Sequence, residues 1–180
     1  MELDIRKRKR VFDGFLKIDE LEVHLPNGEK IERELVYKKD STAIIAIDKD
    51  GQVVLTKQPR VGNGLLESVE IPAGLVEPNE NPIDAAKREL LEETGYASDN
   101  WFELTSFYPD PACCTSKTHL FFAKDAKKVG ELNLDPDEYI ECFCMNLEVL
   151  EKMLKQGSIN DVNTLLAIYE ARKYFEKSED

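Results

Sequence analysis

The chain has 180 residues, of which 42% are hydrophobic and 33% are charged, and its formal net charge is −12. This composition is typical of a soluble globular protein with one domain of good size, or with one domain and a small appendage. The acidic balance argues against general binding to nucleic acid or to a membrane, because both attract basic proteins. No apolar run is long enough to span a bilayer, and the N-terminus lacks a signal-peptide pattern.

Residues 1–40 predict a small antiparallel β unit. Two extended runs, 11–25 and 30–38, flank Pro26-Asn27-Gly28, in which the Asn-Gly pair is typical of a hairpin turn. The basic run at 6–10 is interpreted as a solvated terminus or the start of a strand, and an arm that binds nucleic acid is the alternative.

Residues 41–180 predict one larger domain in which strands and helices alternate. The expected strands are 42–47, 53–58, 65–71, 102–108, 118–123 and 139–145, and the expected helices are 81–94, 147–155 and 160–177. Because hairpins interleave with helices, we expect an α/β (α+β) sandwich with a mixed sheet.

Four cysteines occur as an adjacent pair, Cys113 and Cys114, and as an alternating pair, Cys142 and Cys144. Neither spacing is the C-x-x-C pattern of a zinc site. We therefore interpret all four as buried or loop thiols rather than as ligands of a structural metal. Without an export signal they are expected to stay reduced in the cytoplasm.

The segment Gly74–Tyr96 joins a glycine, a Pro-containing loop and a helix crowded with glutamates. At about 100° per residue, Glu93 lies about 40° from Glu89, and Glu92 lies about 60° away on the other side. Like charges at these spacings weaken an isolated helix. The cluster therefore predicts a bound cation, and carboxylate oxygens suit hard ions such as Mg²⁺. A solvated acidic helix face is the alternative.

The same segment resembles the Nudix hydrolase signature at every specified position, as Gly74-x5-Glu80-x7-Arg88-Glu89-Leu90-x-Glu92-Glu93-x-Gly95-Tyr96. The aromatic last residue is a mild variation, because that position is more often aliphatic. The resemblance implies a Nudix-type α/β/α sandwich with a mixed sheet and a small N-terminal antiparallel β unit. It also implies hydrolysis of a diphosphate linkage that depends on Mg²⁺, or on Mn²⁺.

The resemblance assigns roles to residues of this motif. The implied metal ligands are the Ala73 carbonyl and the carboxylates of Glu89, Glu92 and Glu93. The implied catalytic residues of the helix are Glu92, Glu93 and Arg88, and the arginine orients the glutamates through an ion pair. Gly74 lets the backbone turn tightly or approach a metal. Glu80 either binds metal through water or acts as a cap.

Further landmarks resemble the branch of the family that cleaves ADP-ribose and other nucleoside diphosphate sugars. Arg60 ends a motif whose arginine contacts the diphosphate in relatives, and guanidinium matches phosphate oxygens. Pro111 stands where this branch has a proline after the motif. The next residues depart from the branch, because Ser116 occupies the place of a glutamate that helps hold the distal ribose. Lys117 follows and is expected to contact a phosphate or another sugar instead. This departure weakens the expectation of a preference for ADP-ribose.

The C-terminal third carries two more landmarks. The acidic run at 135–141 resembles the loop that supplies a catalytic or metal-binding glutamate, and Glu138 matches it best. Asp137 and Glu141 are alternatives, and an acidic solvated turn is the other interpretation. The run 157–161 followed by a threonine resembles this branch's entry to its last helix, where capping and packing are expected.

The resemblance also implies a homodimer that forms through the N-terminal β unit. Tyr37 or Phe15 of that unit stacks on the nucleotide base or, alternatively, packs in the core. The expected function is hydrolysis of ADP-ribose or a related nucleoside diphosphate sugar to a nucleoside monophosphate and a sugar phosphate. The alternatives are a nucleoside triphosphate pyrophosphohydrolase, a nucleotide-sugar sensor that does not cleave, and a purely acidic interaction protein.

Overall fold

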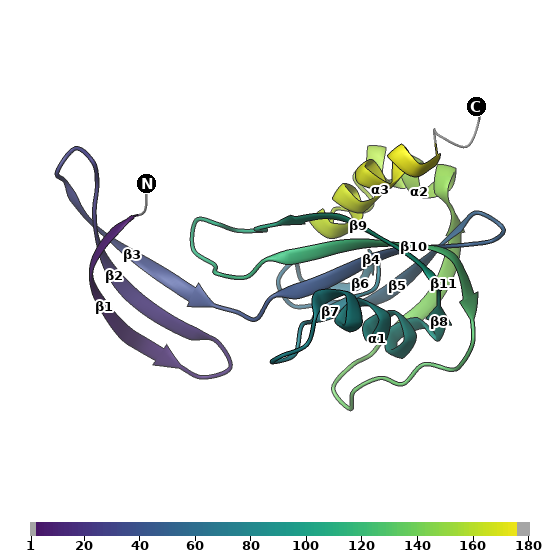
Figure 1. Cartoon of the computed structure of the whole chain (residues 1–180), viewed down its shortest axis with the longest axis horizontal. Coiled ribbons are helices and arrows are strands. Elements are labelled where there is room, and N and C mark those ends of the chain that lie inside the picture. The colour runs from purple at the N-terminus through teal and green to yellow at the C-terminus, as the bar shows by residue number, and fades with distance from the viewer. Residues whose placement is uncertain (1–2, 176–180) are drawn as a thin grey trace. The chain divides into compact units, whose positions relative to one another are not determined.

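The structure is a computed structural model that describes residues 3–175, and it divides the chain into two compact units (Figure 1). In the described part of the chain, the smaller unit comprises residues 3–40 and 107–118, and the larger unit comprises residues 41–106 and 119–175. The smaller unit thus includes a loop from the middle of the chain, which the sequence pattern did not predict.

The smaller unit is built on a three-stranded antiparallel sheet. Its strands are β1 (Asp4–Asp13), β2 (Lys17–His24) and β3 (Lys30–Tyr37), in the order β1-β2-β3. The predicted hairpin turn is confirmed between β2 and β3, where Gly28 has a φ of 86° and its N–H donates to the Leu25 carbonyl. The basic run at 6–10 lies inside β1, as the interpretation of a strand predicted.

Two expectations for this unit are wrong. Residues 11–25 are not one extended run, because a turn separates β1 from β2 and the Gly14 N–H donates to the Leu16 carbonyl. The Asp13-Gly14 pair is a turn signal that the prediction did not weigh. Phe15 does not pack in a core, since 96% of its surface is exposed.

The larger unit is built on an eight-stranded sheet. Its central path runs β11-β5-β4-β10-β8, while β6 pairs with β5, β7 with β4 and β9 with β10. The strands are β4 (Ser41–Asp48), β5 (Gln52–Arg60), β6 (Leu65–Glu70), β7 (Ala73–Leu75), β8 (Tyr96–Ala97), β9 (Asn100–Phe107), β10 (Thr118–Lys128) and β11 (Glu141–Asn146). The helices of the described residues are α1 (Pro82–Thr94), α2 (Leu147–Lys155) and α3 (Val162–Phe175).

Two hydrophobic clusters lie on opposite faces of this sheet, because successive residues of a strand point to opposite faces. The cluster under α1 includes Ile44, Ala46, Ala86 and Leu90. The cluster under α2 and α3 includes Ile45, Ile47, Leu150 and Ile168. One helix therefore covers one face and two helices cover the other (Figure 1). The α/β/α sandwich expected from the sequence is confirmed.

The ends of the helices follow the sequence signals closely. Helix α1 begins with a proline after Asn81 and ends before Gly95, which has a φ of 71° and donates its N–H to the Leu91 carbonyl. Helix α3 begins later than predicted because Asp161 caps it, with its Oδ2 accepting from the Thr164 N–H at 2.8 Å. The expected capping role of this segment is thus confirmed. Residues 176–177 of the predicted helix lie outside the described residues.

Strand lengths were predicted less well. The short strands β7 and β8 were missed, and β10 continues past residue 123 to Lys128 because its end pairs with β8. The last predicted strand begins at Glu141 rather than at 139. These errors fall where pairing with another strand, rather than local composition, extends or starts a strand.

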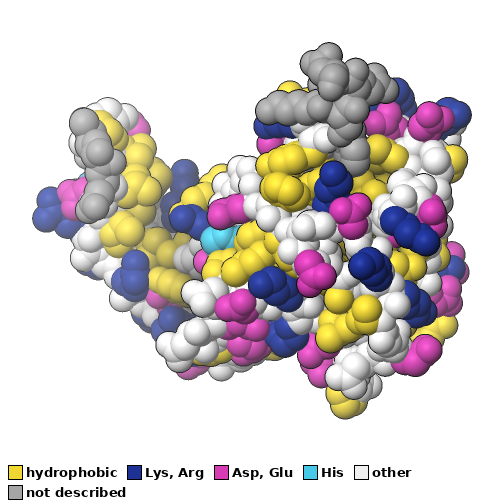
Figure 2. Space-filling model, turned by 45° about the vertical axis from the view of Figure 1, so that its right-hand side comes forward, with side chains coloured by type: hydrophobic (Ala, Val, Ile, Leu, Met, Phe, Trp, Pro, Cys, Tyr) yellow, Lys and Arg dark blue, Asp and Glu magenta, His cyan; other side chains and the backbone are white. Residues whose placement is uncertain are grey.

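The surface carries charges of both signs. On the face in Figure 2, Lys and Arg side chains are interspersed with Asp and Glu side chains and with apolar patches. Among residues 3–175, none of the helices combines the length and the apolar character that crossing a membrane requires.

Leu90 and its neighbour Leu91 allow a matched test of the packing of α1. Leu90 is fully buried in the cluster under the helix, whereas 42% of Leu91 is exposed. We predict that Leu90→Ala lowers the free energy of unfolding by about 2–5 kcal/mol, because it leaves a cavity. Leu91→Ala should change it by less than about 0.5 kcal/mol. Urea unfolding monitored by circular dichroism measures both, and equal effects would contradict this packing.

Candidate active site

The glutamates of α1 are buried because they flank its apolar stripe. Ala86 and Leu90 pack into the sheet, and the same face of the helix brings Glu89 and Glu93 below the surface, with 9% and 3% of each residue exposed. These carboxylates lie one helical turn apart, and Glu92 between them is only partly exposed. The sequence thus places three acidic groups at the edge of a core, where water solvates charge poorly.

Arg88 holds three carboxylates of the motif together. Its Nε and Nη2 donate to the two oxygens of Glu80, each at 3.0 Å. Its Nη1 donates to Glu89 Oε1 at 2.7 Å and to Glu92 Oε2 at 3.0 Å. Its Nη2 also donates to the Leu75 carbonyl at 3.0 Å. One guanidinium therefore links the helix to the loop before it and fixes the orientation of two glutamates.

Glu80 serves the loop rather than the end of the helix. Its carboxylate accepts from Arg88 and, at 2.9 Å, from the Glu77 N–H. The residue before the helix is Asn81, whose side chain makes no capping bond to it. The hydrogen bond from Arg88, with that from the Glu77 N–H, lowers the pKa of Glu80. Glu80 is therefore an ionised partner of the arginine. The backbone N–H that it caps belongs to Glu77, in the turn before the helix.

Glu93 is the most buried glutamate of the cluster. Its Oε2 accepts a hydrogen bond at 3.0 Å from the N–H of Ala73, the first residue of β7. Burial, with the charges of Glu89 and Glu138, raises the pKa of Glu93 to about 8, against the opposing effect of the Ala73 hydrogen bond. Burial also raises the pKa of Glu89, and the hydrogen bond from Arg88 offsets part of that rise.

Gly74 makes room for Glu89. It pairs with Thr42 in the sheet, and a Cβ built on it would overlap the Glu89 carboxylate. Any side chain at this position would displace that carboxylate, so the glycine is required for a close approach. The neighbouring residue Ala73 presents its backbone at the same place, where its N–H contacts Glu93.

The site also contains Glu70, which the sequence pattern did not predict. Arg60 forms a two-point ion pair with Glu70, with contacts of 2.7–3.1 Å, and Glu70 is buried. The charge of Glu93 acts on Arg60 as well, so the arginine lies within electrostatic reach of the cluster. Glu70 is the charged last residue of a strand that forms a hairpin with the strand of Arg60, and this position is the signal for it.

The acidic loop before β11 contributes charge to the cluster. Glu138 is exposed, and its Oε2 accepts from the Asp135 N–H at 3.0 Å within its own turn. Its charge nevertheless acts on Glu89 and Glu93. The alternative Glu141 instead pairs with Lys57 at 3.1 Å, and Asp137 is exposed. Among these three acidic residues, Glu138 is the one whose charge acts on both buried glutamates.

The remaining predicted substrate residues belong to the smaller unit. Pro111 is exposed in the loop between β9 and β10, and Ser116 is partly buried there. The Lys117 N–H donates to Asp40 Oδ1 at 2.8 Å, and the Lys117 Nζ lies 5.1 Å from the centre of the Tyr108 ring. Tyr37 of the same unit lies under Arg10, whose guanidinium carbon is 5.3 Å from the ring centre. Contacts of these residues with a substrate stay a prediction.

The donor set on α1 fits a hard divalent cation. All its side-chain donors are carboxylate oxygens, which suit Mg²⁺ and Mn²⁺ rather than softer metals. Burial, with the neighbouring negative charges, raises the pKa of one of them, Glu93, to about 8. Gly74 keeps the space beside Glu89 clear of a side chain. The residues that would hold the ion are Ala73, Glu89, Glu92 and Glu93.

Comparison with known proteins decides the family. The family model of the NUDIX domain matches residues 37–165, which include every residue of the α1 cluster. The chain belongs to the Nudix family. A solved structure described as an ADP compounds hydrolase superposes with a TM-score of 0.85 and covers 99% of this chain and 97% of its own, at 19% identity. That likeness confirms the Nudix fold.

Curated relatives of this Nudix protein carry several names. An ADP-ribose pyrophosphatase of Bacillus subtilis is 35% identical over 167 residues, which cover 89% of this chain and 88% of the relative. A methanol dehydrogenase activator of Bacillus methanolicus is 36% identical over 165 residues, covering 90% and 88%. A GDP-mannose pyrophosphatase of Citrobacter koseri is 31% identical over 152 residues, covering 79% of each chain. Two of these three names describe cleavage of a nucleoside diphosphate sugar.

The burial of Glu93 predicts how stability depends on pH in the metal-free protein. Because the folded carboxyl binds its proton more tightly than the unfolded one, ionisation disfavours the folded state, and stability falls as the pH rises from the unfolded pKa of 4.5 to the folded value of about 8. Between about pH 6 and about pH 8, the wild type should lose about 2 kcal/mol relative to Glu93→Gln. Urea unfolding in EDTA measures this difference. Parallel pH profiles for the two proteins would contradict it.

Proposed function

We propose that this protein hydrolyses the diphosphate linkage of a nucleoside diphosphate sugar, with ADP-ribose as one candidate substrate. The products would be a nucleoside monophosphate and a sugar phosphate. The observation that carries the proposal is the cluster of oriented carboxylates on α1, which Arg88 holds in place within a Nudix fold. The names of the ADP-ribose and GDP-mannose pyrophosphatases support the substrate class.

In the proposed reaction, a water oxygen bonds to one phosphorus while the bridging P–O bond breaks, and the bridging oxygen leaves with the other phosphate. A divalent cation, Mg²⁺ or Mn²⁺, supplies charge neutralisation at the phosphates and lowers the pKa of the attacking water when bound. Ala73, Glu89, Glu92 and Glu93 would hold it. Such reactions depend mostly on positioning and electrostatics, which this cluster provides.

The other residues of the site have distinct proposed roles. Arg88 keeps Glu89 and Glu92 in one orientation, which removes the cost of arranging them during the reaction. Arg60, itself oriented by Glu70, binds a phosphate of the substrate. Glu138, on an exposed loop, accepts the proton of the attacking water. Ser116 and Lys117, with Pro111 and Gly74, belong to the proposed substrate-binding residues.

A panel of substrates tests the function. We expect turnover of at least one nucleoside diphosphate sugar with Mg²⁺ or Mn²⁺, and a loss of at least about 100-fold in Glu93→Gln, because a metal-positioning group is removed. Product analysis by chromatography measures both. The matched control is Glu148→Gln, since Glu148 is an exposed glutamate in the first turn of α2, on the other face of the sheet.

Each other outcome of this panel has a meaning. Turnover of nucleoside triphosphates alone would favour a triphosphate pyrophosphohydrolase. Binding of nucleotide sugars without any turnover would favour a sensor. Full activity in Glu93→Gln would refute the role of that carboxylate, whatever the substrate.

We further propose that the protein is a homodimer that forms through the N-terminal β unit. All ten residues of β1 are exposed, and an exposed edge strand is available for pairing. Sedimentation equilibrium at micromolar concentration should give a mass of about two chains, and removal of residues 3–13 should shift it toward one. A wild-type mass of one chain would contradict this proposal.

We also infer that the enzyme works in the cytoplasm, where its four free thiols stay reduced.

A further inference from the structure

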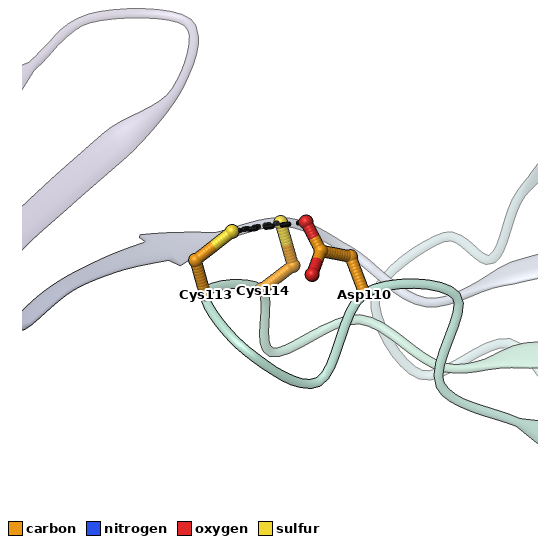
Figure 3. Close-up of side chains that lie close together, drawn as sticks. All are labelled: Asp110, Cys113 and Cys114. Atoms are coloured by element: carbon orange, nitrogen blue, oxygen red, sulfur yellow. Dashed lines mark hydrogen bonds between the residues drawn. The ribbon is translucent and has the colours of Figure 1, made fainter.

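Three metal-ligating side chains converge in the loop between β9 and β10. The ligand atoms of Asp110, Cys113 and Cys114 all lie within 4.8 Å of one another (Figure 3). Over residues 3–175, this is the one group of three or more His, Cys, Asp or Glu side chains that meets so closely. It lies wholly within the smaller unit.

The backbone of the loop holds these side chains in place. The Cys114 N–H donates to the Asp110 carbonyl at 2.9 Å, which closes the turn that brings the aspartate beside the cysteines. The Cys113 carbonyl accepts from the Val36 N–H at 2.7 Å, and the Thr115 N–H donates to the Val36 carbonyl at 3.1 Å. The cysteine pair is therefore fixed to the end of β3 on both sides.

The distances match a tetrahedral metal site. With metal–sulfur bonds of about 2.3 Å, two thiolates of a tetrahedral zinc site lie about 3.8 Å apart. The sulfur atoms of Cys113 and Cys114 are 3.9 Å apart. Asp110 Oδ2 lies 3.0 Å from the Cys113 sulfur, whereas a thiolate sulfur and a carboxylate oxygen bound to one tetrahedral zinc ion lie about 3.5 Å apart. Rotation of the exposed Asp110 side chain would supply that difference, and water would complete the fourth position.

Other uses of the cysteine pair fit less well. A disulfide needs sulfur atoms about 2.05 Å apart, and the observed separation is far larger. A reactive nucleophile needs an accessible thiolate, but the Cys113 thiol donates a hydrogen bond to Asp110 Oδ2 at 3.0 Å. A bound cation, in contrast, displaces the thiol proton that now lies between sulfur and carboxylate.

We propose that this loop binds one thiophilic divalent cation of the zinc class through Asp110, Cys113 and Cys114. The site differs in chemistry from the carboxylates of α1, because thiolates select zinc-class ions whereas carboxylates alone favour Mg²⁺. Adjacent cysteines do not have the C-x-x-C spacing, so the sequence pattern did not predict such a site. Asp110 lies three residues before Cys113, and the turn brings it near both cysteines, where it provides the third ligand.

Titration of the reduced, full-length protein with Co²⁺ tests the proposal. Thiolate-bound Co²⁺ gives a charge-transfer absorption in the near ultraviolet that carboxylate-bound Co²⁺ lacks, so the signal excludes the site on α1. We expect the absorption to saturate at one equivalent and to disappear when one equivalent of Zn²⁺ is added. The double variant C113S/C114S should abolish it, and D110N should weaken Co²⁺ binding by at least about 10-fold.

The matched control is C142S/C144S, which also removes two thiols and should keep the absorption unchanged. Circular dichroism confirms that each variant is folded. Absence of the charge-transfer signal in the wild type, or its persistence in C113S/C114S, would overturn the proposal. If the double cysteine variant does not fold, D110N decides, because unchanged Co²⁺ affinity in that variant also overturns it. None of these measurements depends on hydrolytic activity.

Discussion

The structure depends on one electrostatic constraint, which is the burial of several carboxylates on a single helix. Helix α1 can pack its apolar stripe against the sheet only if it also takes Glu89 and Glu93 out of water. Arg88 compensates part of this charge by bonding Glu80, Glu89 and Glu92 at once. Glu93 receives a backbone N–H, and its burial raises its pKa to about 8. A divalent ion is the partner that would complete the balance.

The rest of the larger unit positions this cluster. The strand β7 places Gly74 against Glu89, where any side chain would clash, and Arg88 reaches the Leu75 carbonyl to attach the helix to that strand. Arg60 arrives from β5 with its guanidinium already oriented by Glu70. These parts come from distant points in the chain, so the sheet determines their geometry. This arrangement provides the positioning that phosphoryl chemistry requires.

Local signals predicted much of this, and long-range pairing accounts for what they missed. Proline after Asn81 and Gly95 marked both ends of α1, and helical periodicity then placed the glutamates on one side of the helix. Nothing local indicates that Glu70 pairs with Arg60, because Glu70 lies opposite Thr56 in the hairpin of β5 and β6, and the arginine side chain reaches it along the strands. The cluster at Asp110 was missed for a similar reason, since a turn rather than a spacing motif brings its ligands together.

The central claim is that a divalent cation replaces a proton on the buried carboxylates of α1. Isothermal titration calorimetry of Mg²⁺ binding near neutral pH, repeated in buffers of different ionisation enthalpy, measures the protons released. Because the pKa of Glu93 is about 8 without metal, we expect release of about one proton per ion bound. Binding of Mg²⁺ with no proton released would show that these carboxylates are already ionised, and would contradict the account.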